Sequence, residues 1–358
     1  MISVMFVADR TTDRAPLFSV LVPTHYRADV IGLAIRSVLA QQEQDFEILV
    51  AGDGAEPGTA EAVLACADPR IRWFDLPKTA GFGYATRNIA LRAARGRYVA
   101  FMADDDLFFP DHLRLLRNQL DAGAMIACTR AAWVSSDGIA APFSNCLALA
   151  DEFEVFRTSF NSLPASCFAY RRDALDDPAP WPEDSPGSGD LHLWRRILAA
   201  HPTRPLGVDP TYGVLHFAAR RRDLRFAGMP DFKVLLDIAD HADWWPAPLR
   251  ADLSSGRPEQ AWYFDRLSQP EGARLLRDAL SRVTDRLAWE LVQSRLPEGQ
   301  RRIRLTATSA QSEAAKEVPG DFDPALYLDL HPDVAQAGMD AADHWLRHGQ
   351  FEHRAYHR

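Results

Sequence analysis

Three consecutive acids, Asp104, Asp105 and Asp106, interrupt the apolar segment VAFMADDDLFFPDHL at residues 99–113. Like charges in a row repel one another, and burying any of them without a partner is costly. A divalent cation would neutralise them, because Mg²⁺ and Mn²⁺ prefer oxygen ligands and commonly bind carboxylates together with phosphate oxygens. The run therefore predicts a metal-assisted phosphate site. The alternative interpretation is that the three acids form the first turn of the following helix, where the helix macrodipole stabilises acidic side chains.

Two glycine-containing turns carry further candidates. Asp53 lies in VAGDGAEPGT, which lacks the spacing of a dinucleotide fingerprint or a P-loop, so a ligand cradle and a tight turn both stay open. In KTAGFGYATRNIAL, Gly81 precedes a predicted helix with Arg87 and Asn88 in its first turns. Such a helix start could receive phosphate, and an ordinary helix cap is the alternative.

Asp190 and His216 are the candidates of the second half. Asp190 follows a Pro-, Gly- and acid-rich loop at 177–190, which we expect to be mobile. On an element that closes over a substrate it could act as a general base, and as a helix N-cap it needs no further role. His216 is a lone histidine in an apolar strand, which favours a core residue. The neighbouring Arg220–Arg222 run suits a diphosphate and favours a ligand.

The elements that must position these residues alternate along the first half. Apolar runs predict strands at 17–24, 46–54, 71–77 and 97–106, and helical spacing predicts helices at 29–42 (with Asp29 as N-cap), 58–67 and 83–96. Such alternation is typical of a parallel sheet with helices on both faces. Because ligands bind at the carboxyl ends of the strands in such sheets, we expect Thr24, Asp53 and Asp104–Asp106 to meet at one edge.

The second half is predicted to be less regular. A helix at 190–201 and a strand at 210–219 precede a helical stretch, a polar segment and a short aromatic segment. The predicted organisation is an N-terminal extension at 1–16, an α/β domain at 17–225, a helical region at 226–310, a linker at 311–321 and a short helical module at 322–358.

Composition excludes several classes of protein. The 358 residues are 47% hydrophobic and 25% charged, as in globular proteins, and the net charge of -9 argues against general nucleic-acid binding. Four cysteines without a CxxC pair exclude a zinc ribbon and favour a reducing compartment. No apolar run approaches the roughly 20 residues of a membrane span, and Asp9 and Asp13 interrupt any signal-like start. We expect a soluble cytoplasmic protein. Peripheral contact with the inner face of the membrane and a homodimer stay open.

Residues 17–120 as a whole resemble the family-2 inverting glycosyltransferases with the GT-A fold, in the order and spacing of their motifs. The resemblance continues through FNSLPASCFAYRRDAL and GDLHLWRRI to about residue 220. It implies a Rossmann-like nucleotide-diphospho-sugar transferase with a mostly parallel sheet flanked by helices, followed by a helical C-terminal region. The last segment, FDPALYLDLHPDVAQAGMDAADHWLRHG, resembles a short helical module of some bacterial surface-polysaccharide enzymes.

The resemblance also assigns residues to roles. It implies a general base at Asp190 and metal ligands at Asp105, Asp106 and His216. The donor nucleotide would contact Pro23, Thr24, Tyr26, Asp53, Gly81, Arg87, Asn88, Asp104 and Asp105. Several positions depart from the family pattern: Gly52 replaces the first acid of the pair often found after the second strand, and Ala55 replaces the usual Ser. Gly189 stands where the family commonly has Glu before the base, and the first acid of the metal motif aligns with either Ala103 or Asp104.

The resemblance therefore implies a metal-dependent inverting glycosyltransferase that uses Mn²⁺ or Mg²⁺. It would move a sugar from a nucleotide-diphosphate donor, a UDP-sugar first, to a hydroxyl of a glycan, a lipid-linked glycan or another surface-polysaccharide precursor. The alternative is a catalytically weak protein that binds sugar nucleotides or glycans on the same fold. A nucleotidyltransferase would need a lysine-rich activating loop near the first strand, and VPTHYRADV has no lysine.

Overall fold

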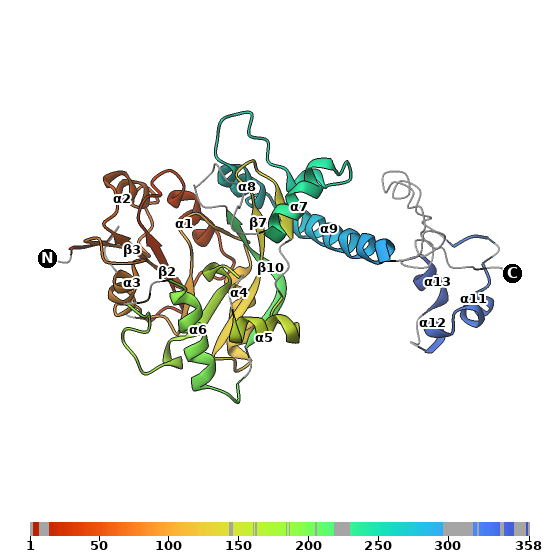
Figure 1. Ribbon diagram of the computed structural model, residues 1–358, viewed down its shortest axis with the longest axis horizontal. Helices are drawn as coiled ribbons and strands as arrows, with labels where there is room; N and C mark the ends of the chain where they lie inside the picture. Colours follow the sequence, from red (N-terminus) through yellow and green to blue (C-terminus); the bar gives the residue numbers. More distant parts are fainter. Residues whose placement is uncertain are drawn as a thin grey trace. The chain divides into compact units, whose positions relative to one another are not determined.

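A computed structural model gives the arrangement of the chain (Figure 1). The residues that it describes are 3–6, 14–142, 146–159, 161, 163–183, 185, 187–204, 206–217, 230–295, 318–320, 322–336, 340–346 and 356. The Arg220–Arg222 run and most of the predicted 311–321 linker lie outside these residues.

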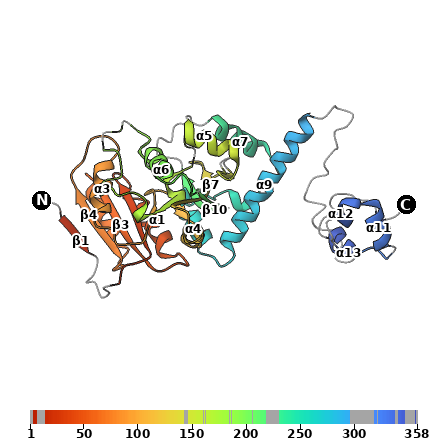
Figure 2. The same cartoon turned by 90° about the horizontal axis from the view of Figure 1, so that it is seen from below.

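Ten strands of the described chain form one mixed sheet flanked by helices (Figures 1 and 2). The strands are β1 (Ser3–Phe6), β2 (Phe18–Thr24), β3 (Phe46–Asp53), β4 (Ile71–Leu76), β5 (Tyr98–Phe101), β6 (Leu107–Phe108), β7 (Ile126–Val134), β8 (Ala140–Pro142), β9 (Phe168–Arg171) and β10 (Gly207–Phe217). Their order is β1-β4-β3-β2-β5-β9-β7-β10-β6, with β8 beside β7. The predicted α/β class is confirmed. The sheet is mixed rather than mostly parallel, because β1, β6, β8 and β9 pair with their neighbours in antiparallel fashion.

The helices of the described chain are α1 (Ile31–Leu39), α2 (Pro57–Leu64), α3 (Tyr84–Leu91), α4 (His112–Asp121), α5 (Ala150–Thr158), α6 (Gly189–Ala200), α7 (Pro230–His241), α8 (Glu259–Leu267), α9 (Gly272–Arg295), α11 (Pro324–Leu330), α12 (Pro332–Gln336) and α13 (Ala341–His344). α3 packs on β2 and β3, and α4 packs on β7 and β10. In α1 the buried side chains include Ile31, Ala34, Ile35 and Val38, which form one face at helical spacing.

The parallel core of the sheet has a switch in strand order. From β2 the chain continues through β3 to β4 on one side, and β5 then pairs with the other side of β2. All residues of β3 and β5 are buried, as expected for strands covered on both faces. In an open α/β sheet, the carboxyl ends of the strands on either side of such a switch leave a crevice for ligands. The switch therefore places the crevice beyond Thr24 and Phe101.

Several sequence predictions need correction at the level of elements. The strand predicted at 97–106 ends at Phe101, so the three acids lie in a turn before β6 rather than at the strand tip. α1 begins at Ile31 with Val30 as its N-cap, so Asp29 is not the cap. The predicted N-terminal extension contains β1, which joins the sheet beside β4.

The chain divides into two compact units, Met1–Ala288 and Trp289–Arg358. The first unit has one continuous core, to which α7, α8 and α9 contribute buried side chains such as Phe232, Tyr263 and Leu280. The second unit has a small core of its own, formed by Tyr327, Val334, Ala341 and Trp345. Among the described helices, none has the length and apolar character needed to cross a membrane.

Candidate active site

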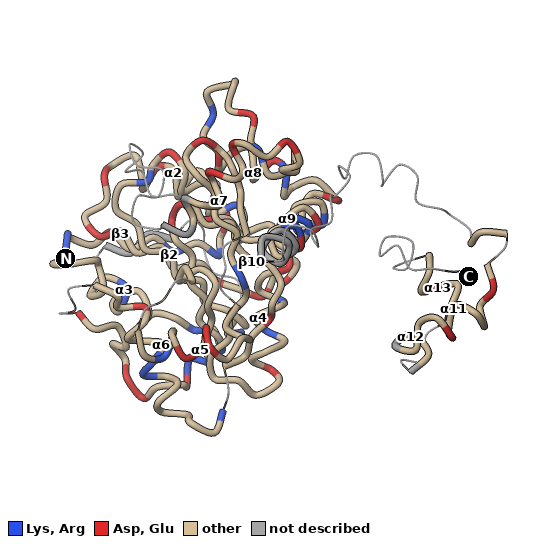
Figure 3. The backbone as a smooth tube through the Cα atoms, turned by 45° about the vertical axis from the view of Figure 1, so that its right-hand side comes forward, with Lys and Arg blue, Asp and Glu red and all other residues tan. Residues whose placement is uncertain are grey.

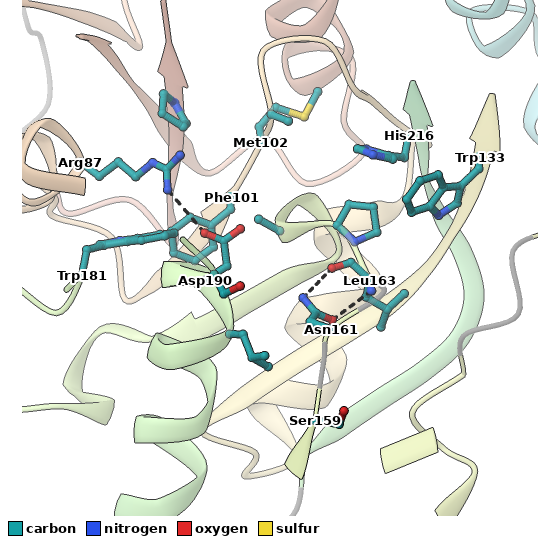
Figure 4. Close-up of a pocket in the computed structure, with 16 residues that line it drawn as sticks. Arg87, Phe101, Met102, Trp133, Ser159, Asn161, Leu163, Trp181, Asp190 and His216 are labelled. Carbon is teal, nitrogen blue, oxygen red and sulfur yellow. Dashed lines mark hydrogen bonds and ion pairs between the residues drawn. The ribbon is translucent and has the colours of Figure 1, made fainter. Parts of the chain in front are cut away.

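A pocket of about 480 Å³ opens at the switch between β2 and β5 (Figure 4). Pro23 from β2 and Phe101, Met102 and Ala103 from the end of β5 line one part of it. Arg87, Trp181 and Asp190 approach from one side, and His216 and Trp133 lie on the other. Residues predicted from segments far apart in the chain therefore meet in one cavity, at the edge that the alternation of strands and helices indicated.

The first two acids of the turn face an arginine. Arg27 Nη2 lies 3.2 Å from Asp105 Oδ2, and Arg27 Nε lies 3.7 Å from Asp104 Oδ1. One guanidinium does not balance both carboxylates. Burial, followed by the charges of Asp106 and Asp104, raises the pKa of Asp105 to about 7 against the opposing effect of Arg27 and His216. The turn thus holds more negative charge than its protein partners compensate.

Asp106 is fully buried and bonded through both oxygens. Its Oδ2 accepts a hydrogen bond of 2.5 Å from the Ser166 hydroxyl, and its Oδ1 lies 2.8 Å from His216 Nδ1. The backbone N–H of Phe217 also donates to Oδ1, at 3.3 Å. Ser166 Oγ accepts from the backbone N–H of Ala103 at 2.9 Å, so one serine fixes both ends of the acid turn.

The donor chemistry of this turn fits a divalent cation, although no group of three or more His, Cys, Asp or Glu side chains within the described ranges is arranged to hold one. The charge of the Asp105 carboxylate is only partly compensated, because Arg27 is its ion-pair partner and the other two acids of the turn repel it. His216 donates from Nδ1 to Asp106, the tautomer that leaves Nε2 as the ligand nitrogen. By the type of donor atom, Asp104, Asp105 and His216 Nε2 suit a cation, although the structure does not arrange the three around one ion. Asp106 suits the orienting carboxylate behind the histidine.

Asp190 lies in the first turn of α6 and lines the pocket. The N-cap of α6 is Ser188 and no side chain caps the helix, so the N-cap alternative for Asp190 is wrong. Arg87 Nη1 lies 3.4 Å from Asp190 Oδ1. Burial raises the pKa of Asp190, and the Arg87 charge opposes that rise without cancelling it. A carboxylate with a raised pKa beside a cavity is suited to accept a proton.

Asp53 lies at the end of β3, buried against the loop that follows β4. It accepts from Lys78 Nζ at 2.5 Å and from the backbone N–H and the hydroxyl of Thr79, at 2.8 and 2.9 Å. Burial raises the pKa of Asp53, but these hydrogen bonds outweigh that effect and hold it below its usual value. Gly83 adopts a φ of +73°, which favours glycine. A Cβ at this position would also lie only 3.1 Å from Asp53 Oδ2, so a larger residue would crowd the carboxylate.

The other predicted donor contacts are spread around the same edge. Thr24 is buried at the end of β2, and Tyr26 is 58% exposed with its ring against His25 at 3.5 Å between centroids. Gly81 has a positive φ, in the loop before α3. Asn88 is fully buried and does not line the pocket, because its amide is bonded to the segment that begins at Trp181.

Four contributors to the site were not predicted from the sequence: Arg27, Trp133, Ser166 and Trp181. Trp181 had a usable signal, since a lone tryptophan in a Pro-rich loop is expected to be anchored. Ser166 and Arg27 had none, because their roles depend on the acids of a distant segment. The loop at 177–190, predicted to be mobile, is held in its described part by Asn88 and by Arg196, which bonds Asp177 Oδ2 and the Pro180 carbonyl.

Residues 19–177 match the model of a family described as Glycosyl transferase family 2. The succinoglycan biosynthesis protein ExoO of Rhizobium meliloti (strain 1021) is 37% identical over 154 residues, which are 43% of this chain and 42% of ExoO. The UDP-Glc:alpha-D-GlcNAc-diphosphoundecaprenol beta-1,3-glucosyltransferase WfgD of Escherichia coli is 33% identical over 99 residues, which are 28% of this chain and 39% of WfgD. The matched part thus spans less than half the length of either curated relative.

Among solved structures, S. aureus TarS 1–349 in complex with UDP-GlcNAc is similar with a TM-score of 0.45 and 20% identity. The similar part covers 70% of each chain.

Proposed function

We propose that the pocket binds a nucleoside diphosphate sugar and transfers the sugar to an acceptor hydroxyl with inversion, because residues 19–177 match the Glycosyl transferase family 2 model. Two groups at the switch point of the sheet carry the proposal: Asp190, which lines the cavity, and the acid turn, which adjoins the cavity through Ala103 and through His216, the partner of Asp106. One group suits the diphosphate and the other suits the proton of the attacking hydroxyl.

The reaction is a single displacement at the anomeric carbon. The acceptor oxygen forms a bond to that carbon, the bond from the carbon to the β-phosphate oxygen breaks, and the nucleoside diphosphate leaves with the bonding electrons. Asp190 takes the proton of the acceptor hydroxyl, since it is the carboxylate with a raised pKa that lines the pocket. Attack from the face opposite the leaving group inverts the anomeric configuration.

The turn at Asp104–Asp106 is proposed to hold the diphosphate end of the donor. Asp104, Asp105 and His216 would hold a divalent cation, Mn²⁺ or Mg²⁺, while Asp106 and Ser166 orient the histidine and the turn. When bound, such a cation neutralises charge that develops on the leaving diphosphate. Pro23, Thr24, Tyr26 and Asp53 are proposed for the nucleotide, because they lie at the ends of β2 and β3 or directly after them.

UDP is the nucleotide that we propose first, because WfgD is named for UDP-glucose. The acceptor is proposed to be a growing polysaccharide or a lipid-linked glycan, since ExoO is named for succinoglycan biosynthesis and WfgD for a diphosphoundecaprenol-linked sugar. A cytoplasmic location, peripheral membrane contact and a homodimer stay predictions.

Asp190→Asn tests the proposal. The amide cannot accept the proton, so kcat should fall by about 10²- to 10⁴-fold, the range for losing a general base. The affinity for UDP with Mn²⁺, measured by calorimetry, should stay as in the wild type. Release of UDP from a panel of sugar nucleotides in the presence of glycan acceptors gives the turnover.

Asp177→Asn is the matched control, because Asp177 lies in the same loop region and also pairs with an arginine, Arg196, but does not line the pocket. It should keep wild-type turnover. Turnover of Asp190→Asn close to that of this control would contradict the base role. Binding without turnover for every donor would favour the alternative of a sugar-nucleotide-binding protein.

A further inference from the structure

Helix α3 turns one face toward the segment that carries Asp190. Tyr84, Arg87 and Asn88 are spaced i, i+3 and i+4, so their side chains leave the helix on one side. Each of them contacts the segment 181–190: Asn88 at its beginning, and Tyr84 and Arg87 at its end. No other described helix makes a hydrogen bond to Asp190 through a side chain.

Asn88 binds the backbone of Trp181 from both sides. Its Nδ2 donates to the Trp181 carbonyl at 3.0 Å, and its Oδ1 accepts from the Trp181 N–H at 3.0 Å. The same Nδ2 donates to Glu183 Oε1 at 2.8 Å. A single buried amide thus replaces the two hydrogen bonds that a neighbouring strand would make, which fixes the position and the orientation of Trp181.

The ring of Trp181 links Asn88 to the residues that contact Asp190. It stacks on Tyr84 with an interplanar angle of 17° and 5.7 Å between centroids. The guanidinium of Arg87 lies 4.6 Å from the Trp181 ring and 5.0 Å from the Tyr84 ring, and pairs with Asp190 at 3.4 Å (Figure 4). Two aromatic faces restrict the arginine, and the arginine in turn restricts the carboxylate.

The start of α6 is tied to the same helix. The Tyr84 hydroxyl accepts from the backbone N–H of Gly189 at 2.9 Å, directly before Asp190. A Cβ at Gly189 would lie 2.5 Å from the Tyr84 ring, so the two backbones approach as closely as glycine allows. Glycine at this position, where the family commonly has Glu, is required by this contact.

We propose that α3 positions the general base, with Asn88 as a positioning residue that acts through Trp181 and Arg87. This inference rests on the proposed function. It moves Asn88 from the predicted donor site to the support of Asp190, because the Asn88 amide is fully buried and bonded to protein. Asn88 does not line the pocket, so we expect its effect to be larger on turnover than on donor affinity.

Asn88→Ala in the full-length protein is the test. Releasing Trp181 displaces Arg87 and Asp190, and a misplacement of about 1 Å can cost about 10²-fold in rate, so we expect kcat to fall by about 10²-fold. The KM for the donor and the calorimetric affinity for UDP with Mn²⁺ should change far less than kcat. A merely structural residue would lower the melting temperature without this division between kcat and KM.

Gln41→Ala is the matched control. Gln41 is also a buried amide with three hydrogen bonds, to Ser37, Phe109 and Leu113, and it does not contact the segment 181–190. Both variants should lower the melting temperature, and only Asn88→Ala should lose turnover. Equal turnover of the two variants would overturn the inference.

A second pair of variants separates positioning from general damage. Asn88→Asp places a carboxylate against Glu183 and should lose turnover, and Glu183→Gln in the same chain supplies a donor to that carboxylate and should recover part of it. Absence of any recovery would count against the inference. A wild-type protein that binds UDP but transfers no sugar would contradict the proposed function. An active wild-type protein whose Asn88 variants keep full turnover would contradict only the inference about Asn88.

Discussion

Asp104, Asp105 and Asp106 are stabilised unequally by the residues around them. Asp106 has Ser166, His216 and the Phe217 backbone as partners, whereas Asp104 and Asp105 share one arginine. Burial lowers the pKa of His216, but the charge and hydrogen bond of Asp106 raise it above its usual value. Protein groups therefore compensate the charge of Asp106 but not the combined charge of Asp104 and Asp105. A cation suits the position of these two carboxylates.

Asp105→Asn should abolish the effect of the metal on donor binding. The amide keeps the size of the side chain but removes the charge, and even groups outside the ligand shell commonly cost about 10- to 100-fold in metal affinity when lost. We expect Mn²⁺ affinity to fall by at least about 100-fold and UDP binding to become insensitive to Mn²⁺. Calorimetric titration of Mn²⁺, then of UDP with and without Mn²⁺, measures both. Unchanged titrations would remove Asp105 from the predicted ligands.

Arg87→Gln should move the acid limb of the pH–rate profile to higher pH. Burial raises the pKa of Asp190 and Arg87 opposes the rise, so loss of the guanidinium raises this pKa further. The base works in its ionised form, which is lost as pH falls through its pKa. Without Arg87 that loss begins at a higher pH. The pH dependence of kcat measures the shift.

Arg196→Gln serves as the control for this profile, because Arg196 pairs with Asp177 away from the pocket. Its acid limb should coincide with that of the wild type. An Arg87→Gln limb at wild-type pH would mean that Arg87 does not act on the base.

At the scale of elements, the site depends on where two strands end and how two helices meet. β2 and β5 leave the crevice at the switch of strand order, and α3 holds the first turn of α6 beside it. The contact between α3 and α6 needs a residue without a side chain at Gly189. The need for glycine at position 189 arises only when the two helices pack together, so neither sequence segment alone indicates it.

Gly189→Ala should destabilise the protein and lower turnover. The added Cβ would lie 2.5 Å from the Tyr84 ring, and overpacking of this kind costs about 1–3 kcal/mol. Denaturant unfolding measures the loss, and kcat should fall because Asp190 moves with the helix start. Gly58→Ala is the control. Gly58 also lies in a first helical turn, but its Cβ would make an ordinary contact of 3.5 Å with Ala28. Equal stability of both variants would contradict the close approach.

The molecule as a whole consists of a large unit that contains the entire candidate site and a small C-terminal unit. The large unit, Met1–Ala288, has its own core, and the core of the second unit uses different residues. Along the described part of the backbone, acidic and basic residues are interspersed (Figure 3). This mixture, together with the net charge of -9, argues against general nucleic-acid binding.

Removal of residues 296–358 should leave the large unit folded and able to bind its donor. The truncation keeps α9 complete and removes none of the side chains of the main core. We expect the melting temperature of the large unit and the affinity for UDP with Mn²⁺ to match those of the full chain. A collapse of either value would show that the C-terminal unit stabilises the site.

The α/β class and most elements of the first 96 residues could be predicted from the amino-acid sequence, because apolar periodicity reports burial locally. Strands β2, β3 and β4 and helices α1, α2 and α3 lie within the predicted ranges or differ from them by a residue or so. The sequence also indicated Asp190 and the acid turn as polar groups next to apolar runs. Strand β7 was missed although its mainly apolar sequence, IACTRAAWV, which only Thr129 and Arg130 interrupt, is a usable signal.

The hydrogen-bond and ion-pair partners of these groups could not be predicted, because they depend on the tertiary structure. Ser166 lies 60 residues beyond Asp106 in the chain and Asp190 lies 103 beyond Arg87, and no local pattern encodes a hydrogen bond across such separations. The same holds for the early end of β5 at Phe101, which follows from pairing with β2 and β9, and for the antiparallel strands that make the sheet mixed. Burial is set by the local alternation of residue types, whereas charge compensation is set by which segments the fold brings together.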